Sequence, residues 1–210
     1  MSMARNPVPF NRAKSRFKPQ PTVLVICEDR KSGKQYLEDA SRHLRADVYV
    51  DINHCGNTDP RGIVAEAISR QGKFDRVFCA IDRDNHNNFD EAVALAKTSS
   101  KIDLIVSYPC FEFWLLLHYG YTRKPYTAIG RDSAADLLIR DLRNCPDMPE
   151  YDKGDKRSIF NMLLGDKFDF ARKTAPQILE EAINDSEMNP STRLHELLNY
   201  FESLSKPQLL

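Results

Sequence analysis

Apolar residues in the first half of the chain form short continuous runs, separated by stretches in which they recur every three to four positions. The continuous runs at 22–27, 77–81 and 102–107 are typical of strands covered on both faces of a sheet. Residues 47–52 alternate apolar and polar side chains, as a strand nearer a sheet edge does. The pattern therefore predicts four strands before residue 110.

Helices are predicted between these strands. Residues 32–44 have helical periodicity, and Asn88 precedes a helix at 89–98. Asp59 followed by Pro60 is typical of a helix start, here of a helix that ends near residue 70. Because strands that alternate with short helices indicate βαβ units, we expect an α/β fold with a mainly parallel sheet and flanking helices.

The second half of the chain has almost no strand pattern. Helical periodicity covers residues 111–118, 133–143, 159–164, 168–184 and 192–203. Pro176 is expected near the start of a helix or at a bend, and the NPST segment at 189–192 is interpreted as the cap of the last helix. The predicted organisation is an arm at 1–20, an α/β core at 21–110 and a helical extension at 111–210 packed on that core.

The charge of the chain is balanced overall but uneven locally. Among 210 residues, 30 Lys and Arg match 30 Asp and Glu, so the net charge requires no nucleic-acid partner. Residues 1–20 carry basic side chains and no acid: Arg5, Arg12, Lys14, Arg16 and Lys18. Four prolines at or near this segment favour extended backbone (Pro7, Pro9, Pro19 and Pro21). It is interpreted either as a flexible tail or as an arm that lies on phosphates.

The sequence also indicates a compartment. No stretch is long and apolar enough to cross a membrane, and no secretory signal is found. The five cysteines are an odd number without a CxxC pair. We therefore expect a reduced, cytoplasmic protein with no membrane partner.

Acidic side chains follow two of the predicted buried strands. Glu28 comes directly after the first strand, while Asp82, Asp84 and His86 follow the strand at 77–81. Since the carboxyl ends of parallel strands meet at one sheet edge, these groups are expected to converge. An incomplete set of carboxylate oxygens suits Mg²⁺ or Mn²⁺, which keeps water and substrate phosphate as further ligands. Two alternatives stay open: the aspartates can be ordinary turn residues, and Glu28 can cap the following helix.

Other kinds of site have weaker support. The five histidines are scattered, and none stands at zinc-ligand spacing from a cysteine. No glycine-rich phosphate loop is found. Cys110 and His118 could form a nucleophile pair, but core residues follow Cys110 and we interpret it as structural.

Four segments together resemble the RloB family of bacterial proteins: TVLVICE at 22–28, DRDNH at 82–86, SYPCFEFWLLLHY at 107–119 and NPSTRLHELL at 189–198. The resemblance extends over about residues 16–204. It implies a Toprim-type domain, the metal-binding α/β fold of topoisomerases, primases and OLD-family nucleases. It also implies a place in restriction or abortive-infection loci, often beside an ATPase of the ABC or AAA type.

By this resemblance, Glu28 is the Toprim glutamate, and Asp82 and Asp84 are the Toprim DxD pair. The first motif of the family reads closer to CEGEKTE, whereas this chain has CEDRKSG at 27–33. Asp29 replaces the glycine of that motif, and Arg30 and Gly33 each replace a glutamate.

Glu112 is a further candidate because aromatic residues flank it in the sequence PCFEFW. A carboxylate in such surroundings is costly to bury unless it is paired or coordinated. We interpret Glu112 either as an accessory group at the metal or as a core carboxylate bonded to an arginine or a helix N-terminus.

Basic residues in the helical half are candidates for nucleic-acid binding. Lys153, Lys156 and Arg157 lie near Tyr151 and Phe160, and basic residues interleaved with aromatic ones can hold a nucleic-acid backbone and stack bases. Arg193, in the segment that resembles the family, is added to this group. A solvated charged face is the alternative.

These observations predict a Mg²⁺- or Mn²⁺-dependent nuclease that acts in anti-phage defence. Glu28, Asp82 and Asp84 are predicted to hold the ion, with His86 and Glu112 as accessory groups. Arg30 or Lys31 is predicted to neutralise charge on the reacting phosphate. RNA such as tRNA is favoured over DNA, by analogy with related defence proteins. The alternative is a non-catalytic partner-binding or sensor subunit of an ATPase-containing complex, and a homo-oligomer is also compatible with the sequence.

Overall fold

The computed structural model describes residues 19–56, 59–83 and 87–206. Most of the predicted basic arm lies outside these residues, and so do Asp84 and His86. The other predicted site residues, from Glu28 to Arg193, are described.

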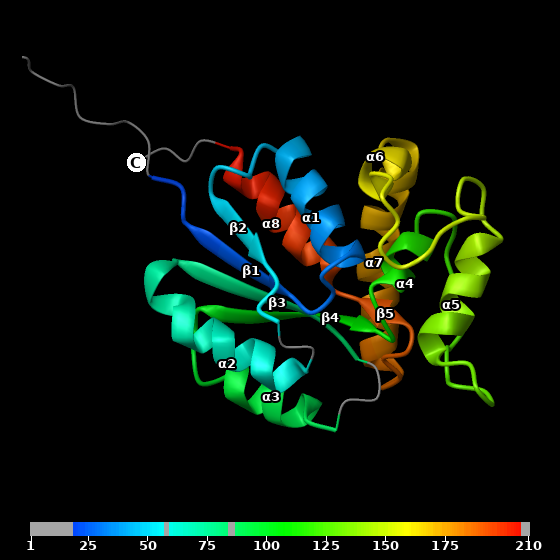
Figure 1. The fold of residues 1–210 in the computed structure, drawn as a ribbon, viewed down its shortest axis with the longest axis horizontal. Coiled ribbons are helices and arrows are strands. Elements are labelled where there is room, and N and C mark those ends of the chain that lie inside the picture. Colours follow the sequence, from blue (N-terminus) through cyan, green and yellow to red (C-terminus); the bar gives the residue numbers. More distant parts are fainter. Residues whose placement is uncertain (1–18, 57–58, 84–86, 207–210) are drawn as a thin grey trace, which may run out of the picture.

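In the described part of the chain, five strands form one sheet in the order β2-β1-β3-β4-β5 (Figure 1). The strands are β1 (Val23–Cys27), β2 (Val50–Asn53), β3 (Arg76–Asp82), β4 (Ile102–Tyr108) and β5 (Ser191–Thr192). Strands β1 to β4 are parallel, and β5 pairs with β4 in the antiparallel direction. The predicted α/β fold with a mainly parallel sheet is confirmed.

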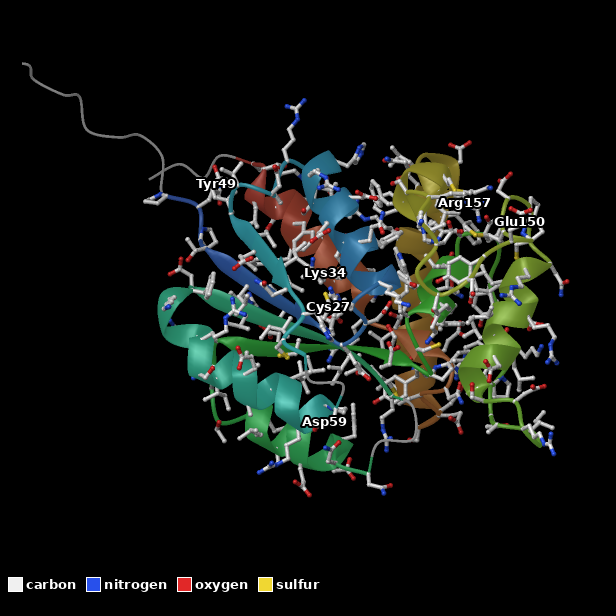
Figure 2. All side chains as sticks on the ribbon, in the orientation of Figure 1. Cys27, Lys34, Tyr49, Asp59, Glu150 and Arg157 are labelled. Carbon is white, nitrogen blue, oxygen red and sulfur yellow. The ribbon has the colours of Figure 1, made fainter. Side chains whose placement is uncertain are left out.

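Helices cover both faces of this sheet (Figure 1). One face carries α1 (Ser32–His43) and α8 (Leu194–Leu204); the other carries α2 (Pro60–Arg70), the short 3₁₀ helix η1 (Gln71–Lys73) that follows it, and α3 (Phe89–Ala96). Successive side chains of β1 point to opposite faces, so Val23 and Val25 pack in the core with α1 while Leu24 and Ile26 pack with α2. The predicted cap at Asp59 is present, since its carboxylate accepts the Gly62 N–H at 2.9 Å (Figure 2).

The remaining helices lie on the side toward which β1 and β3 point (Figure 1). They are α4 (Glu112–Leu116), α5 (Ala134–Arg143), α6 (Ile159–Leu163) and α7 (Asp166–Asn184). Trp114 of α4 and Phe160 of α6 are fully buried in the same core cluster as Tyr36 of α1. These helices therefore cover the carboxyl ends of the strands, where the predicted site lies.

Three details differ from the sequence-based expectation. Strand β2 begins at Val50, not at residue 47, because residues 47–49 form a turn in which the Tyr49 N–H donates to the Ala46 carbonyl. Of the two places expected for Pro176, the start of a helix is wrong, because Pro176 lies well inside α7. The NPST segment is more than a helix cap, since Ser191 and Thr192 form β5 and α8 begins only at Leu194.

Pairing with β4 explains the third difference. The hydroxyls of Ser107 and Thr192 are 2.9 Å apart and both side chains are buried, so the segment completes the sheet edge. The Thr192 hydroxyl also accepts the Leu194 N–H at 3.2 Å, which links β5 to the first turn of α8.

Within the described residues, no helix has both the length and the apolar character needed to cross a bilayer. The five cysteines are all free thiols.

Candidate functional site

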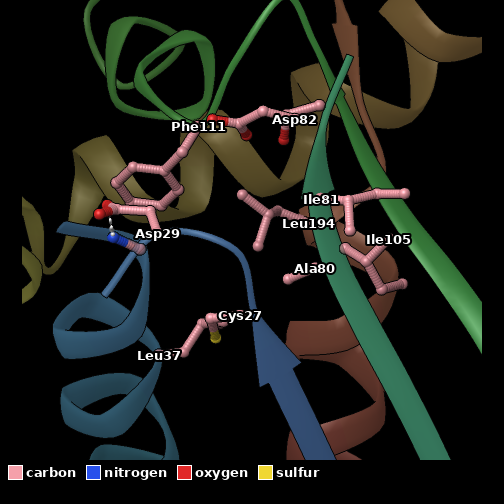
Figure 3. Close-up of a pocket in the computed structure, with 11 residues that line it drawn as sticks. Cys27, Asp29, Leu37, Ala80, Ile81, Asp82, Ile105, Phe111 and Leu194 are labelled. Carbon is pink, nitrogen blue, oxygen red and sulfur yellow. Dashed lines mark hydrogen bonds between the residues drawn. The ribbon is translucent and has the colours of Figure 1, made fainter. Parts of the chain in front are cut away.

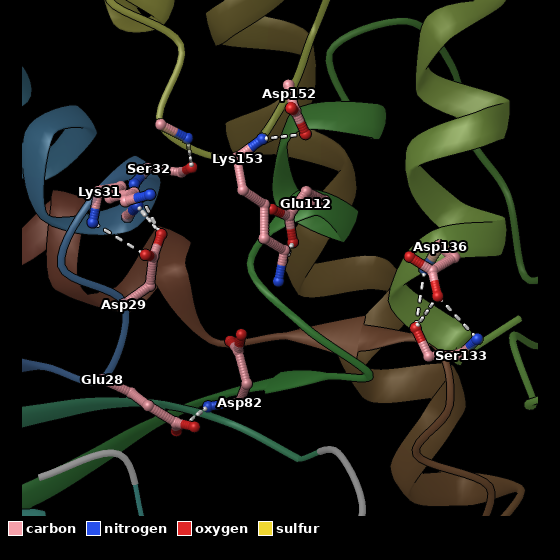
Figure 4. Close-up of polar contacts among 12 residues, drawn as sticks. Glu28, Asp29, Lys31, Ser32, Asp82, Glu112, Ser133, Asp136, Asp152 and Lys153 are labelled. Carbon is pink, nitrogen blue, oxygen red and sulfur yellow. Dashed lines mark hydrogen bonds and ion pairs between the residues drawn. The ribbon is translucent and has the colours of Figure 1, made fainter.

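The ends of β1 and β3 bring two predicted carboxylates together. Asp82 is the last residue of β3, and Glu28 directly follows β1. The Glu28 N–H continues the strand pairing by donating to the Ala80 carbonyl at 3.0 Å. The Glu28 side chain then turns toward β3, where its Oε2 accepts the Asp82 N–H at 3.0 Å (Figure 4). Parallel pairing of adjacent strands thus places both acids at one edge, as the sequence predicts.

A third carboxylate, Glu112, faces this pair from the first turn of α4. Its side chain is only 1% exposed. Its Oε1 accepts a hydrogen bond from the Tyr151 hydroxyl at 3.2 Å, whereas its Oε2 has no hydrogen-bond partner among the residues that the structure describes. The nearest cation to Oε2 is the Lys153 ammonium at 3.8 Å. Figure 4 shows Lys153 alongside Glu112, with its ammonium directed toward Asp82.

The charges of these groups are strongly coupled. Burial raises the pKa of Asp82 well above its usual value, and the carboxylates of Glu112 and Glu28 raise it further. Burial also raises the pKa of the neighbouring Cys110 thiol, with Glu112 and Asp82 adding to the effect. For Lys153, burial lowers the pKa but the negative charge of Glu112, Cys110 and Asp82 outweighs it, and the pKa rises to about 12. The site therefore attracts positive charge.

The donor chemistry of the site fits a hard divalent cation. Glu28, Asp82 and Glu112 offer only oxygen, which Mg²⁺ and Mn²⁺ prefer. Within the described residues the buried Oε2 of Glu112 accepts no hydrogen bond, and a bound ion would satisfy an oxygen of this kind. In the residues that the structure describes, no three acidic, histidine or cysteine side chains already form a ligand cluster. The predicted ligand Asp84 and the predicted accessory residue His86 lie outside those residues.

A small cavity of about 20 Å³ lies below the carboxylates, enough for about one water molecule. Figure 3 shows Asp82 and Phe111 near one end of it and Cys27 and Leu37 near the other. Its walls are mainly apolar, with Leu194 of α8 closing one side. Because these apolar walls keep the local dielectric constant low, they strengthen the electrostatic interactions of the Asp82 carboxylate.

Asp29 has a structural task that the sequence did not reveal. Its carboxylate accepts the backbone N–H groups of Lys31, Ser32 and Gly33 at 2.9, 2.7 and 2.7 Å. These are donors of the first turn of α1, which otherwise lack partners. The change from the family's glycine to Asp29 therefore supplies a cap for α1, directly beside Glu28.

The predicted basic residues do not form one surface. Lys153 is part of the carboxylate site, whereas Arg157 is bonded to Asp155 through its Nε and Nη2. Arg193 pairs with Glu196 and lines a separate hollow near α3 and the start of β4. Lys156 is exposed.

The residues predicted to neutralise phosphate charge lie apart from these basic residues. Arg30 and Lys31 line a hollow along α1. Sequence reasoning could not find the pairing of Lys153 with Glu112, because these residues are far apart in the chain and no pattern connects them.

A family model described as RloB-like protein matches residues 23–201. No curated protein and no solved structure matches the chain.

Proposed function

The chain belongs to the RloB-like protein family, and we propose that it is a metal-dependent nuclease that hydrolyses phosphodiester bonds. The observation that supports the proposal is the placement of Glu28 and Asp82 at neighbouring strand ends, with the buried Glu112 nearby, whose Oε2 accepts no hydrogen bond within the described residues. Several buried carboxylates near one another are unfavourable, and a cation that joined them would relieve this cost.

Each side chain has a defined part in this proposal. Asp82 and Glu28 would hold the ion from the two strand ends, and Glu112 would contribute a third carboxylate. A bound Mg²⁺ or Mn²⁺ supplies polarisation of the phosphate and a water of lowered pKa. Tyr151 fixes the orientation of Glu112 through its hydroxyl. The Lys153 ammonium, already at this site, balances negative charge when a phosphate enters.

The fold supports a Toprim-like assignment. The glutamate follows the first strand, the aspartate ends the third, and these two strands are neighbours in a parallel sheet. We propose RNA, such as tRNA, as the substrate and anti-phage defence as the setting. Both rest on the resemblance of the chain to defence-associated proteins.

The test is cleavage of total tRNA, other RNA and plasmid DNA with Mg²⁺ or Mn²⁺, with and without any ATPase encoded nearby. Asp82→Asn removes one charge without a change of shape, and we expect it to reduce cleavage by about 100-fold or more. Asp169→Asn is the matched control, since Asp169 lies exposed on α7, away from the site. Its rate should equal that of the wild type.

A non-catalytic role in an ATPase-containing defence complex is the second candidate. The Lys153 ammonium favours it, because it already neutralises part of the cluster. If neither the wild type nor Asp82→Asn cleaves nucleic acid and the wild type binds no Mn²⁺, the nuclease proposal is rejected and this candidate is supported. Equal cleavage by wild type and Asp82→Asn would instead show that the activity belongs to another site.

A further inference from the structure

A basic hollow of about 360 Å³ lies along α1, next to the carboxylate site. Its lining includes four basic side chains and one acid: Arg30, Lys31, Lys34, Arg42 and Glu38. The chain as a whole has no net charge, so this excess of positive charge is local. A local basic surface beside a site attracts anions to that site.

The helical period of α1 creates this surface. Lys31, Lys34, Glu38 and Arg42 follow one another at intervals of three or four residues and therefore share one face. The opposite face is buried through Tyr36, Leu37 and Ala40. The 12 residues of α1 extend over about 18 Å, long enough for several consecutive phosphates of a single strand.

The charges of this face are accessible. Arg30 and Lys31 are exposed and make no ion pair within residues 19–56, 59–83 and 87–206. Lys34 pairs with Glu38 at 2.5 Å, and Arg42 pairs with Asp39. The Lys34 and Arg42 side chains remain 28% and 61% exposed in these pairs, so phosphates can compete for both cations.

The hollow leads to the carboxylates. Gly154 forms part of its wall, and its N–H donates to the Ser32 hydroxyl at 3.1 Å. Its φ is +86°, and an added Cβ would lie 2.7 Å from Cδ of Lys31, so glycine allows this close approach. Lys153, the residue before it, contacts Glu112. One short segment therefore forms both a wall of the hollow and the cationic side of the site.

We propose that this hollow binds the phosphate backbone of single-stranded RNA and guides it to Asp82. The inference rests on the proposed nuclease function and names the route of its substrate. It places the main phosphate contacts on Arg30, Lys31 and the exposed face of α1. The binding energy is mostly electrostatic, so affinity depends on salt and little on base sequence.

The test is binding of a labelled oligouridylate of about 12 nucleotides, measured by fluorescence anisotropy in EDTA at several salt concentrations. For the double variant Arg30→Gln/Lys31→Gln we expect affinity at low salt to fall about tenfold or more. The slope of log K against log salt should become shallower by about 1.4, since each lost contact to a single strand removes about 0.7. Arg42→Gln should produce a smaller loss in the same direction.

The matched control is Lys97→Gln/Arg131→Gln, which removes the same two charges from exposed positions outside the hollow. It should bind as the wild type does. Equal weakening by both double variants would mean that only net charge matters and would overturn the proposal, as would a wild type that binds no RNA. Melting curves of each variant exclude loss of folding as the cause.

The result is separable from the nuclease proposal because binding is measured without metal. Asp82→Asn should retain RNA affinity while it loses cleavage. If Arg30→Gln/Lys31→Gln loses RNA binding and the wild type never cleaves, the hollow is supported and the nuclease proposal is rejected. If the variant binds RNA as the wild type does and the wild type cleaves, only the proposal for the hollow is rejected.

Discussion

Glu112 and Lys153 form an ion pair with very unequal surroundings. The carboxylate is 1% exposed, whereas the lysine side chain is 45% exposed. A buried carboxylate with an oxygen that accepts no hydrogen bond is unfavourable. The positive charge of the partly exposed Lys153 reduces this cost. A divalent cation at the strand ends would use the same oxygen. The ammonium and such an ion would therefore compete for Glu112.

This competition leads to a prediction for Lys153→Met, which keeps the length of the side chain and removes its charge. We expect the variant to bind Mn²⁺ about tenfold more tightly, since one nearby positive charge no longer repels the ion. In the absence of metal it should be less stable than the wild type, because Glu112 loses its ion pair with Lys153. Calorimetric titration and thermal melting measure the two effects. Lys153→Arg keeps the charge and should behave like the wild type in both; an unchanged affinity in Lys153→Met would refute the competition.

At the scale of elements, the start of α1 links the fold to the site. The helix begins at Ser32, but its first N–H groups are bonded by Asp29, which lies outside the helix. The same short turn carries Glu28 on one side and Arg30 and Lys31 on the other. A loosened turn would displace the carboxylate and the basic hollow together.

Asp29→Ala should therefore destabilise the protein by about 1 kcal/mol, since loss of a helix cap costs about 0.5–2 kcal/mol. For a chain of this size the melting temperature should fall by about 2–4 °C per kcal/mol. Asp136→Ala is the matched control: Asp136 is half of the capping box of α5, away from the site. Both variants should lose stability, but only Asp29→Ala should also weaken RNA binding. Equal RNA binding in the two variants would contradict this link.

At the scale of the whole molecule, one aromatic core joins the two halves of the chain. Tyr36 of α1 packs edge-on against Trp114 of α4 and Phe160 of α6. His118 lies among them, 3.3 Å from the Tyr36 hydroxyl through Nε2 and 2.9 Å from the Trp114 carbonyl through Nδ1. With both nitrogens engaged and little exposure, His118 is a structural group.

This core makes a prediction for acid stability. Burial lowers the pKa of His118 from 6.5 to about 4. Between those values the unfolded chain binds the proton and the folded chain does not, so stability falls as pH falls through this window. The loss at His118 should reach about 3 kcal/mol. Urea unfolding of wild type and His118→Gln at pH 7 and pH 4.5 measures it: the variant should lose less stability than the wild type on acidification, and an equal loss would show that His118 is not responsible.

The sequence by itself predicted four of the five described strands, most of the helices and the placement of Glu28 and Asp82 at one sheet edge. Continuous apolar runs and capping residues act over a few neighbouring positions, so β1, β3, β4 and α2 could be read locally. Once the sheet is parallel, Glu28 and Asp82 must lie at the same edge, and the structure shows them joined by a hydrogen bond.

Only the tertiary structure decided the rest. Strand β5 is two residues long and pairs with β4 across 85 positions of sequence, too short and too distant for any pattern to reveal. Glu112 bonds to Tyr151, which is 39 positions away in the sequence. The same irregular segment that carries Tyr151 also brings Lys153 to Glu112. Local propensity fixes where an element begins and ends. Which charges meet depends on how distant segments pack around a shared core, and that is a property of the folded chain.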